Sequence, residues 1–195
     1  MLAPVLVTPP AVPLWTAEEA IARLHLLVDS TDDNALIDHY IEAATAHLDG
    51  YSGILGRALV TQTWRIDASA WGFPFIRLPL APVQSVTVKY FDGANIEQTL
   101  AADQYEFFSD ALGPRIARAP SASWPSLYAR SDAVRVTFIA GYGGAATDVP
   151  ASIRQAVLML AAHWYTNREA VAEQGMASIP MGVDALIAPY RRHWL

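Results

Sequence analysis

The chain has 195 residues, with 13 Lys and Arg against 19 Asp and Glu, for a formal charge of −6. This length predicts one domain with a core of its own, and the acidic balance excludes a generally basic nucleic-acid binder, though not a local basic patch. Cysteine is absent, which excludes disulfides, thiolate nucleophiles and cysteine-based zinc sites. The chain is 53% apolar and only 16% charged, which favours an apolar surface that a partner covers.

Residues 1–15 are apolar but contain four prolines and no basic residue. A signal peptide needs a basic start and an unbroken apolar run, so the pattern favours an extended, polyproline-like arm instead. No later segment reaches 18 apolar residues without a charge, and we therefore expect no transmembrane helix. The cytosol is the default compartment.

Helical periodicity marks three stretches of the chain. Thr16 and Glu19 have the spacing of a capping box, which predicts a helix over residues 17–27. An apolar stripe then predicts a helix over 33–50, and the short link between the two favours an antiparallel pair. A proline suited to a first helical turn begins a third helix over 150–170.

Between residues 58 and 140 the hydrophobic period changes to two. Val83–Phe91 is rich in β-branched and aromatic residues and runs into Asp92-Gly93, a strong hairpin signal. Val134–Ala140 is a further strand, and glycines follow it at once. The predicted fold class is α+β: a small helical bundle, made of an N-terminal helical hairpin and a long C-terminal helix, with an inserted antiparallel β region.

The predicted domain layout has three parts. Residues 1–15 form the extended arm, residues 16–173 form a single domain, and residues 174–195 form a C-terminal loop and tail. Residues 1–50 hold eight acidic side chains and one basic side chain, so the helical hairpin presents an acidic surface. This is either a solvated face or a face for a basic partner, and the solvated face is the simpler interpretation.

None of the usual catalytic or metal-binding patterns occurs in the sequence. The five histidines form no HExxH motif, and the glycines at 141–144 match neither a dinucleotide fingerprint nor a P-loop. We therefore predict no catalytic, cofactor or metal site and no enzymatic activity. Trp64, Trp71 and Trp124 leave one alternative open, a carbohydrate-binding or hydrolytic function, although aromatic residues on strands more often belong to a core or an interface.

The C-terminus is the stretch with the composition of a binding site. Tyr190, Arg191, Arg192 and Trp194 are of the residue types enriched in binding hot spots. A frayed terminus is the competing interpretation.

The order of several segments resembles one protein family, the head–tail connector (adaptor) proteins of tailed bacteriophages and of phage-derived gene transfer agents. The resemblance spans residues 17–192. It lies in these segments: LHLLVDSTDDNALIDHYIEAATAHLDGYSG, RALVTQTWRID, IRLPLAPVQSVTVKYFDG, ASWPS, VRVTFIAGYG, VPASIRQAVLMLAAHWYTNREAV and MGVDALIAPYR.

The resemblance implies a structural protein without cofactors. It implies a ring, typically twelvefold, that docks beneath the portal at the capsid vertex, accepts a tail-side connector or stopper protein on its other face, and lets DNA pass without sequence-specific binding. Copies in isolation could be monomers. It implies assembly in the bacterial cytoplasm and a place in the virion, with no membrane contact. It also implies portal contact through residues 188–195, and so through Tyr190, Arg191, Arg192 and Trp194.

Overall fold

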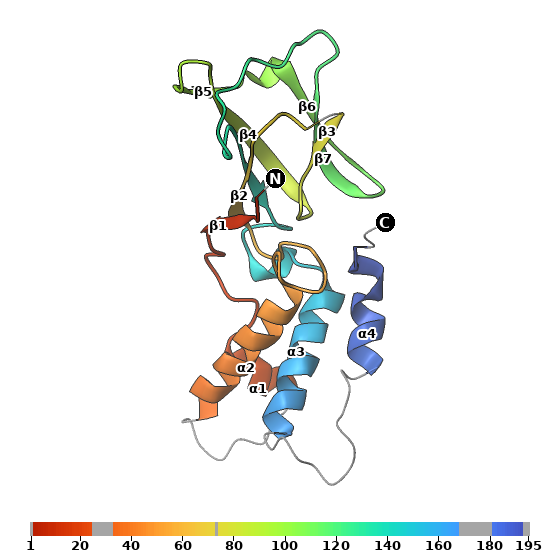
Figure 1. Cartoon of the computed structure of the whole chain (residues 1–195). Coiled ribbons are helices and arrows are strands. Elements are labelled where there is room, and N and C mark those ends of the chain that lie inside the picture. The colour runs from red at the N-terminus through yellow and green to blue at the C-terminus, as the bar shows by residue number, and fades with distance from the viewer. Residues whose placement is uncertain (1, 25–32, 73, 168–180, 193–195) are drawn as a thin grey trace. The chain divides into compact units, whose positions relative to one another are not determined.

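The computed structural model describes residues 2–24, 33–72, 74–167 and 181–192, and in them the chain forms four α-helices and eight strands (Figure 1). The chain divides into two compact units. The sheet unit holds residues 1–10, 61–141 and 192–195, and the helical unit holds residues 11–60 and 142–191. No helix in these described ranges is long and apolar enough to cross a membrane.

The helices of the helical unit are α1 Ala17–Leu24, α2 Asp33–Leu48, α3 Ala151–Thr166 and α4 Met181–Ile187, followed by the 3-10 turn η3 Ala188–Tyr190. The start of α1 is a capping box. The Thr16 N–H donates to the Glu19 carboxylate at 3.1 Å, and the Glu19 N–H donates to the Thr16 hydroxyl at 3.3 Å. Residues at helical spacing on α2 are buried, and α2 and α3 lie side by side (Figure 1).

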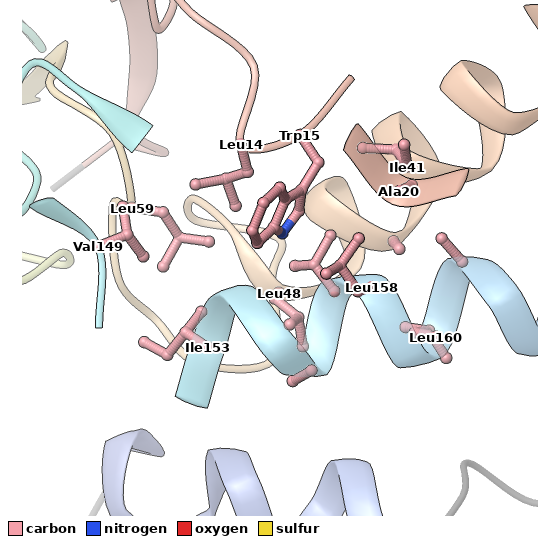
Figure 2. Packing of buried hydrophobic residues seen from close by; sticks show 14 of the residues in the cluster. Leu14, Trp15, Ala20, Ile41, Leu48, Leu59, Val149, Ile153, Leu158 and Leu160 are labelled. Carbon is pink, nitrogen blue, oxygen red and sulfur yellow. The ribbon is translucent and has the colours of Figure 1, made fainter. Parts of the chain in front are cut away.

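The core of the helical unit forms where α1, α2 and α3 meet. Trp15 points from the chain before α1 toward α3 (Figure 2), and its indole N–H donates to the Arg154 carbonyl at 2.9 Å. The guanidinium carbons of Arg23 and Arg154 lie 4.8 and 5.4 Å from the centroid of the same ring. Trp15 therefore buries its apolar body while its one polar atom keeps a partner.

The sheet unit contains two antiparallel sheets. The strands are β1 Val5–Thr8, β2 Gln62–Ala68, β3 Phe75–Arg77, β4 Val83–Phe91, β5 Glu97–Thr99, β6 Tyr105–Asp110, β7 Gly113–Arg118 and β8 Val134–Ala140. The five-stranded sheet has the order β1-β2-β8-β4-β5, and the three-stranded sheet has the order β3-β7-β6. Burial alternates strictly along β8, as expected for a strand with one face on a core.

A side-chain hydrogen bond joins the two sheets. Tyr105 on β6 donates its hydroxyl to the Val86 carbonyl of β4 at 3.1 Å, and burial raises the pKa of this tyrosine above its ordinary value. Apolar side chains of both sheets are buried, among them Val136, Phe138 and Ile116. The sheet unit therefore has an interior of its own.

The predicted fold class is wrong in its balance of helix and strand. We expected a small helical bundle with an inserted β region, whereas the described chain has eight strands in two antiparallel sheets beside its four helices, a mixed α/β architecture. The sequence pattern missed β1 and β3. These strands have four and three residues, too few for a period to show, and β1 lies in the proline-rich start where we expected an extended arm.

The predicted helices and strands overlap the observed ones where the residues are described. The predicted helix 17–27 overlaps α1, and its last three residues lie outside the described residues. The predicted helix 150–170 overlaps α3, and residues 168–170 also lie outside the described residues, as do residues 174–180 and 193–195 of the predicted loop and tail. The strands expected at Val83–Phe91 and Val134–Ala140 are present as β4 and β8.

Candidate interaction surfaces

The C-terminal segment is anchored in the helical unit through α4. Val183 and Ile187, one turn apart on α4, are buried, while Met181 at the start of the helix is exposed. The side chains of Tyr190, Arg191 and Arg192, which the sequence marked as candidates, follow at the end of this segment. Trp194, the fourth candidate, lies outside the described residues.

Tyr190 is held by two hydrogen bonds inside the helical unit. Its carbonyl accepts from the Arg57 guanidinium at 2.6 Å, and its hydroxyl accepts from the Ser152 hydroxyl at 3.1 Å. The ring is half-buried against the core of the helical unit. Tyr190 therefore fixes the end of η3 and offers only part of its ring to a partner.

The two arginines of the segment take separate partners. Arg191 pairs with the Asp184 carboxylate at 2.6 Å, and both side chains are more than a third exposed. An exposed ion pair contributes about 0–1 kcal/mol, so Arg191 can exchange Asp184 for a partner's carboxylate at little cost. Arg192 instead donates to the backbone carbonyls of Pro79 at 2.6 Å and Leu112 at 2.9 Å, both in the sheet unit.

The three-stranded sheet carries a cluster of arginines and phenylalanines that sequence reasoning missed. The Arg115 guanidinium carbon lies 4.7 Å from the Phe75 ring centroid and 4.4 Å from that of Phe108. Asp110 pairs with Arg77 at 3.0 Å and with Arg115 at 3.3 Å. The hydrogen bond from Arg77 is the largest of the effects that lower the pKa of Asp110.

A second cluster of this kind surrounds Phe91 at the end of β4. Arg130 and Arg135 lie over its ring, with guanidinium carbons 3.7 and 4.9 Å from the centroid. Asp132 binds Arg130 at 2.6 Å and Arg135 at 2.7 Å, and these hydrogen bonds hold the pKa of Asp132 far below its ordinary value. In both clusters two arginines share one aspartate of the same chain, so each cluster links neighbouring segments of the sheet unit.

The histidines and tryptophans do not converge on a site in the described structure. No group of three metal-ligating side chains lies together among the described residues. Trp64 is buried and donates its indole N–H to Gln62 at 3.0 Å. Trp71 and Trp124 stack on each other at 4.4 Å, and the three rings therefore form no single open platform for a sugar.

Sequence comparison identifies a family over the C-terminal third of the chain. The family described as "Phage gp6-like head-tail connector protein" matches residues 128–191, which include α3, α4 and the candidate tail residues up to Arg191. No curated protein matches the chain in sequence.

Solved structures match the chain over almost its whole length. A chain of the structure "Virion of native gene transfer agent (GTA) particle" is 29% identical with a TM-score of 0.79, and the match covers 100% of this chain and 97% of that one. A chain of "Neck of empty GTA particle computed with C6 symmetry" has the same identity and coverage, with a TM-score of 0.78. A chain of "Neck of native GTA particle computed with C12 symmetry" is 30% identical with a TM-score of 0.73, covering 98% of this chain and 97% of that one.

These matches agree with one another and with the resemblance seen in the sequence. The family match runs from the segment before β8 through the helices that end the chain, and the structural matches extend through both units. The chain therefore belongs to the head–tail connector proteins of bacteriophages and phage-like gene transfer agent particles.

Proposed function

We propose that this connector docks as a ring on the portal at the capsid vertex and joins the head to the tail, with DNA passing through the ring. The observation that carries the proposal is the extent of the match to chains from the neck of a gene transfer agent particle, 97% of their length at 29–30% identity. A likeness confined to one unit would support only a shared fold. The observed match extends through both units, and this extent supports a shared role.

The ring is proposed to be twelvefold in the particle. The support is the C12 symmetry with which one neck structure was computed. A ring repeats one pair of different surfaces around a closed axis, so each copy must offer two distinct faces. The chain could be a monomer in isolation and assemble on the portal, with a tail-side connector or stopper on the opposite face.

The portal-binding segment is proposed to be residues 188–195, with Tyr190, Arg191, Arg192 and Trp194 as contact residues. The exposed pair of Arg191 and Asp184 supports this, because a weak surface pair leaves the guanidinium available to a partner. The earlier division into an arm, one domain and a tail stays a prediction. The role is structural, without catalysis or cofactors, in a particle assembled in the bacterial cytoplasm.

The acidic helical hairpin of α1 and α2 is our candidate for the wall of the DNA channel. Residues 1–50 hold eight acidic residues and one basic residue, with Glu18, Glu19 and Glu42 exposed on α1 and α2. Such a wall repels the passing phosphates instead of holding them. Changing Glu18 and Glu42 to lysine, with Glu19 kept because it caps α1, is expected to slow DNA release from purified particles, more so at low salt. An unchanged rate would remove this surface from the channel.

The first test is the mass of the purified chain by light scattering, alone and mixed with its own portal. A 21 kDa species that shifts to a stoichiometric complex with the portal ring is the expected result. A chain that never binds the portal would overturn the proposal. A screen against glycans and peptidoglycan would then examine the carbohydrate-binding alternative.

A further inference from the structure

The sheet unit ends in a strand whose outer edge is apolar and uncharged. β1 is the first strand of the five-stranded sheet and pairs on one side only, with β2. Val5, Leu6 and Val7 are 46%, 42% and 51% exposed. Edge strands offer unpaired N–H and C=O groups, and proteins usually protect them with charge, proline or a cover. Prolines flank β1, but no charged side chain lies within it.

The opposite end of the same sheet shows what a protected edge looks like in this chain. β5 is three residues long, and its Glu97 binds Lys89 at 3.0 Å and Arg135 at 3.0 Å. These charges would have to be desolvated if another strand paired there. The apolar edge at β1 is therefore a feature of that strand and not of the whole sheet.

A second apolar edge lies on the other sheet of the same unit. β6 ends the three-stranded sheet and pairs on one side only, with β7. Phe107 and Phe108 at its centre are 38% and 37% exposed. Glu106 lies before them, and Asp110, which pairs with Arg77 and Arg115, lies two residues after them, so this edge is charged at its ends and apolar at its centre. In Figure 1 β1 and β6 lie apart within the sheet unit, so these two edge strands do not pair with each other within one copy.

We propose that the β1 edge of one copy pairs with the β6 edge of the next copy, so that a continuous backbone contact links neighbouring subunits of the ring. This inference rests on the proposed function, which supplies the ring. Cross-strand pairs of aromatic and β-branched side chains are among the favourable ones, and a parallel pairing with Leu6 opposite Phe107 sets Val7 opposite Phe108 and Thr8 opposite Ser109.

The alternatives within a homo-oligomer are less suited to a ring. Two β6 edges would pair about a twofold axis, which closes a dimer. Two β1 edges would pair about a twofold axis, which closes a dimer and leaves nothing to continue a ring. Only the pairing of unlike edges repeats around an axis of higher order.

The short length of β1 limits the affinity between neighbouring copies. It has four residues and an irregular register between Leu6 and Thr8, so the contact adds few backbone hydrogen bonds. We therefore expect the edges to pair when the portal holds the copies in place, and not in dilute solution.

The chain has no cysteine, so every cross-link between two of its copies forms through introduced residues. Thr8 on β1 and Ser109 on β6 are exposed, and Thr8→Cys and Ser109→Cys are small changes at those edges. A short bis-maleimide reagent tolerates a register that differs by a residue or two. In particles or portal complexes of the full chain, the double variant is expected to give a ladder of covalent multimers on a denaturing gel.

The single variants serve as controls. A mixture of the two single variants is expected to stop at covalent dimers, and each single variant alone is expected to stay monomeric. Dimers from Thr8→Cys alone would mean that β1 pairs with itself, and dimers from Ser109→Cys alone would mean that β6 does. Either result overturns the inference.

A charged edge provides the second measurement. Leu6→Lys places a charge on the exposed β1 edge, and Ile96→Lys places one on an apolar residue that is 58% exposed and lies outside both edges. Leu6→Lys is expected to lower the yield of cross-linked multimers at least tenfold, and Ile96→Lys is expected to leave it unchanged. Equal yields would contradict the pairing.

The result separates this inference from the proposed function. Light scattering of the unsubstituted chain with the portal is measured first. A ring that forms but gives no ladder from the double variant overturns the edge pairing alone. A chain that forms no ring with the portal overturns the proposed function, and the pairing with it.

Discussion

The guanidinium of Arg192 occupies the space in front of Gly113. It donates to the carbonyl of Leu112, the residue before this glycine, at 2.9 Å, and to the carbonyl of Pro79 at 2.6 Å. A Cβ added to Gly113 would collide with the guanidinium, and the backbone of this glycine has φ +115°. The turn between β6 and β7 thus depends on glycine for two reasons, its backbone conformation and the arginine that lies against it.

Gly113→Ala is expected to lower the free energy of unfolding by about 1–3 kcal/mol, because φ +115° is strained for any residue with a Cβ. The new methyl group also displaces the Arg192 side chain from its carbonyl partners. Denaturant unfolding measures the first effect. In the Arg192→Ala background the cost of Gly113→Ala should be smaller, since there the collision no longer occurs.

Gly144→Ala is the matched control for this change. No heavy atom lies within 4 Å of a Cβ added to Gly144, so we expect a change of no more than about 0.5 kcal/mol. If both alanine variants unfold alike, the strain at Gly113 has no energetic consequence.

The sequence predicts the longer strands because their pattern is local. β4 and β8 have nine and seven residues rich in β-branched and aromatic types, and the alternation along β8 matches its burial. The predicted helical bundle failed because β1 and β3 are short and depend on their neighbours. Val5–Thr8 becomes a strand because it pairs with β2. No pattern within residues 5–8 predicts this pairing.

The candidate tail residues could be found from composition, but their partners could not. Arg192 binds carbonyls of residues about 80 and 113 positions earlier in the chain. The stack of Arg130 and Arg135 on Phe91 likewise joins β4 to β8 and to the segment before β8, which meet only in the folded sheet. Such contacts depend on tertiary structure, and a single sequence carries no periodic signal for them.

Asp132 is expected to make the stability of the chain fall in acid. Hydrogen bonds from Arg130 and Arg135 hold its pKa far below the ordinary value of 3.8 in the folded state. A carboxyl with a lowered folded pKa contributes its stability above the unfolded pKa and loses it as the pH falls toward the folded pKa. Asp132→Asn should therefore reduce the slope of unfolding free energy against pH below about pH 4.

Asp103→Asn is the control for the acid measurement, because Asp103 is an exposed carboxylate outside both arginine clusters. We expect this variant to keep the slope of the unsubstituted chain. Part of the slope should persist in Asp132→Asn, since the pKa values of Glu97 and Asp110 are also lowered. A slope identical in all three proteins would contradict the assignment to Asp132.

Ile153 tests the core of the helical unit. Its side chain is fully buried on α3 among the residues shown in Figure 2. Ile153→Ala is expected to cost about 2–5 kcal/mol of unfolding free energy, from the lost burial and the cavity left behind. Gln155→Ala, two residues along the same helix and exposed, should change it by less than about 0.5 kcal/mol. If the two variants lose the same unfolding free energy, Ile153 does not belong to the core.

Two truncations separate portal binding by the tail from its role in the fold. Truncation after Arg192 removes Trp194 but keeps the residues that bind Asp184, Pro79 and Leu112. We expect its thermal stability to match that of the full chain, while its affinity for the portal falls about tenfold or more, the loss typical of a hot-spot tryptophan.

Truncation after Pro189 also removes Tyr190 and with it the hydrogen bonds from Arg57 and Ser152. This variant should lose both stability and portal affinity, and particles that carry it should fill with DNA and then lose it or fail to join tails. Light scattering with the portal and thermal unfolding measure the two effects. If truncation after Arg192 leaves portal affinity unchanged, Trp194 is not a contact. If truncation after Pro189 still gives normal particle yield, the whole segment lies outside the interface, because all four candidate side chains are then gone.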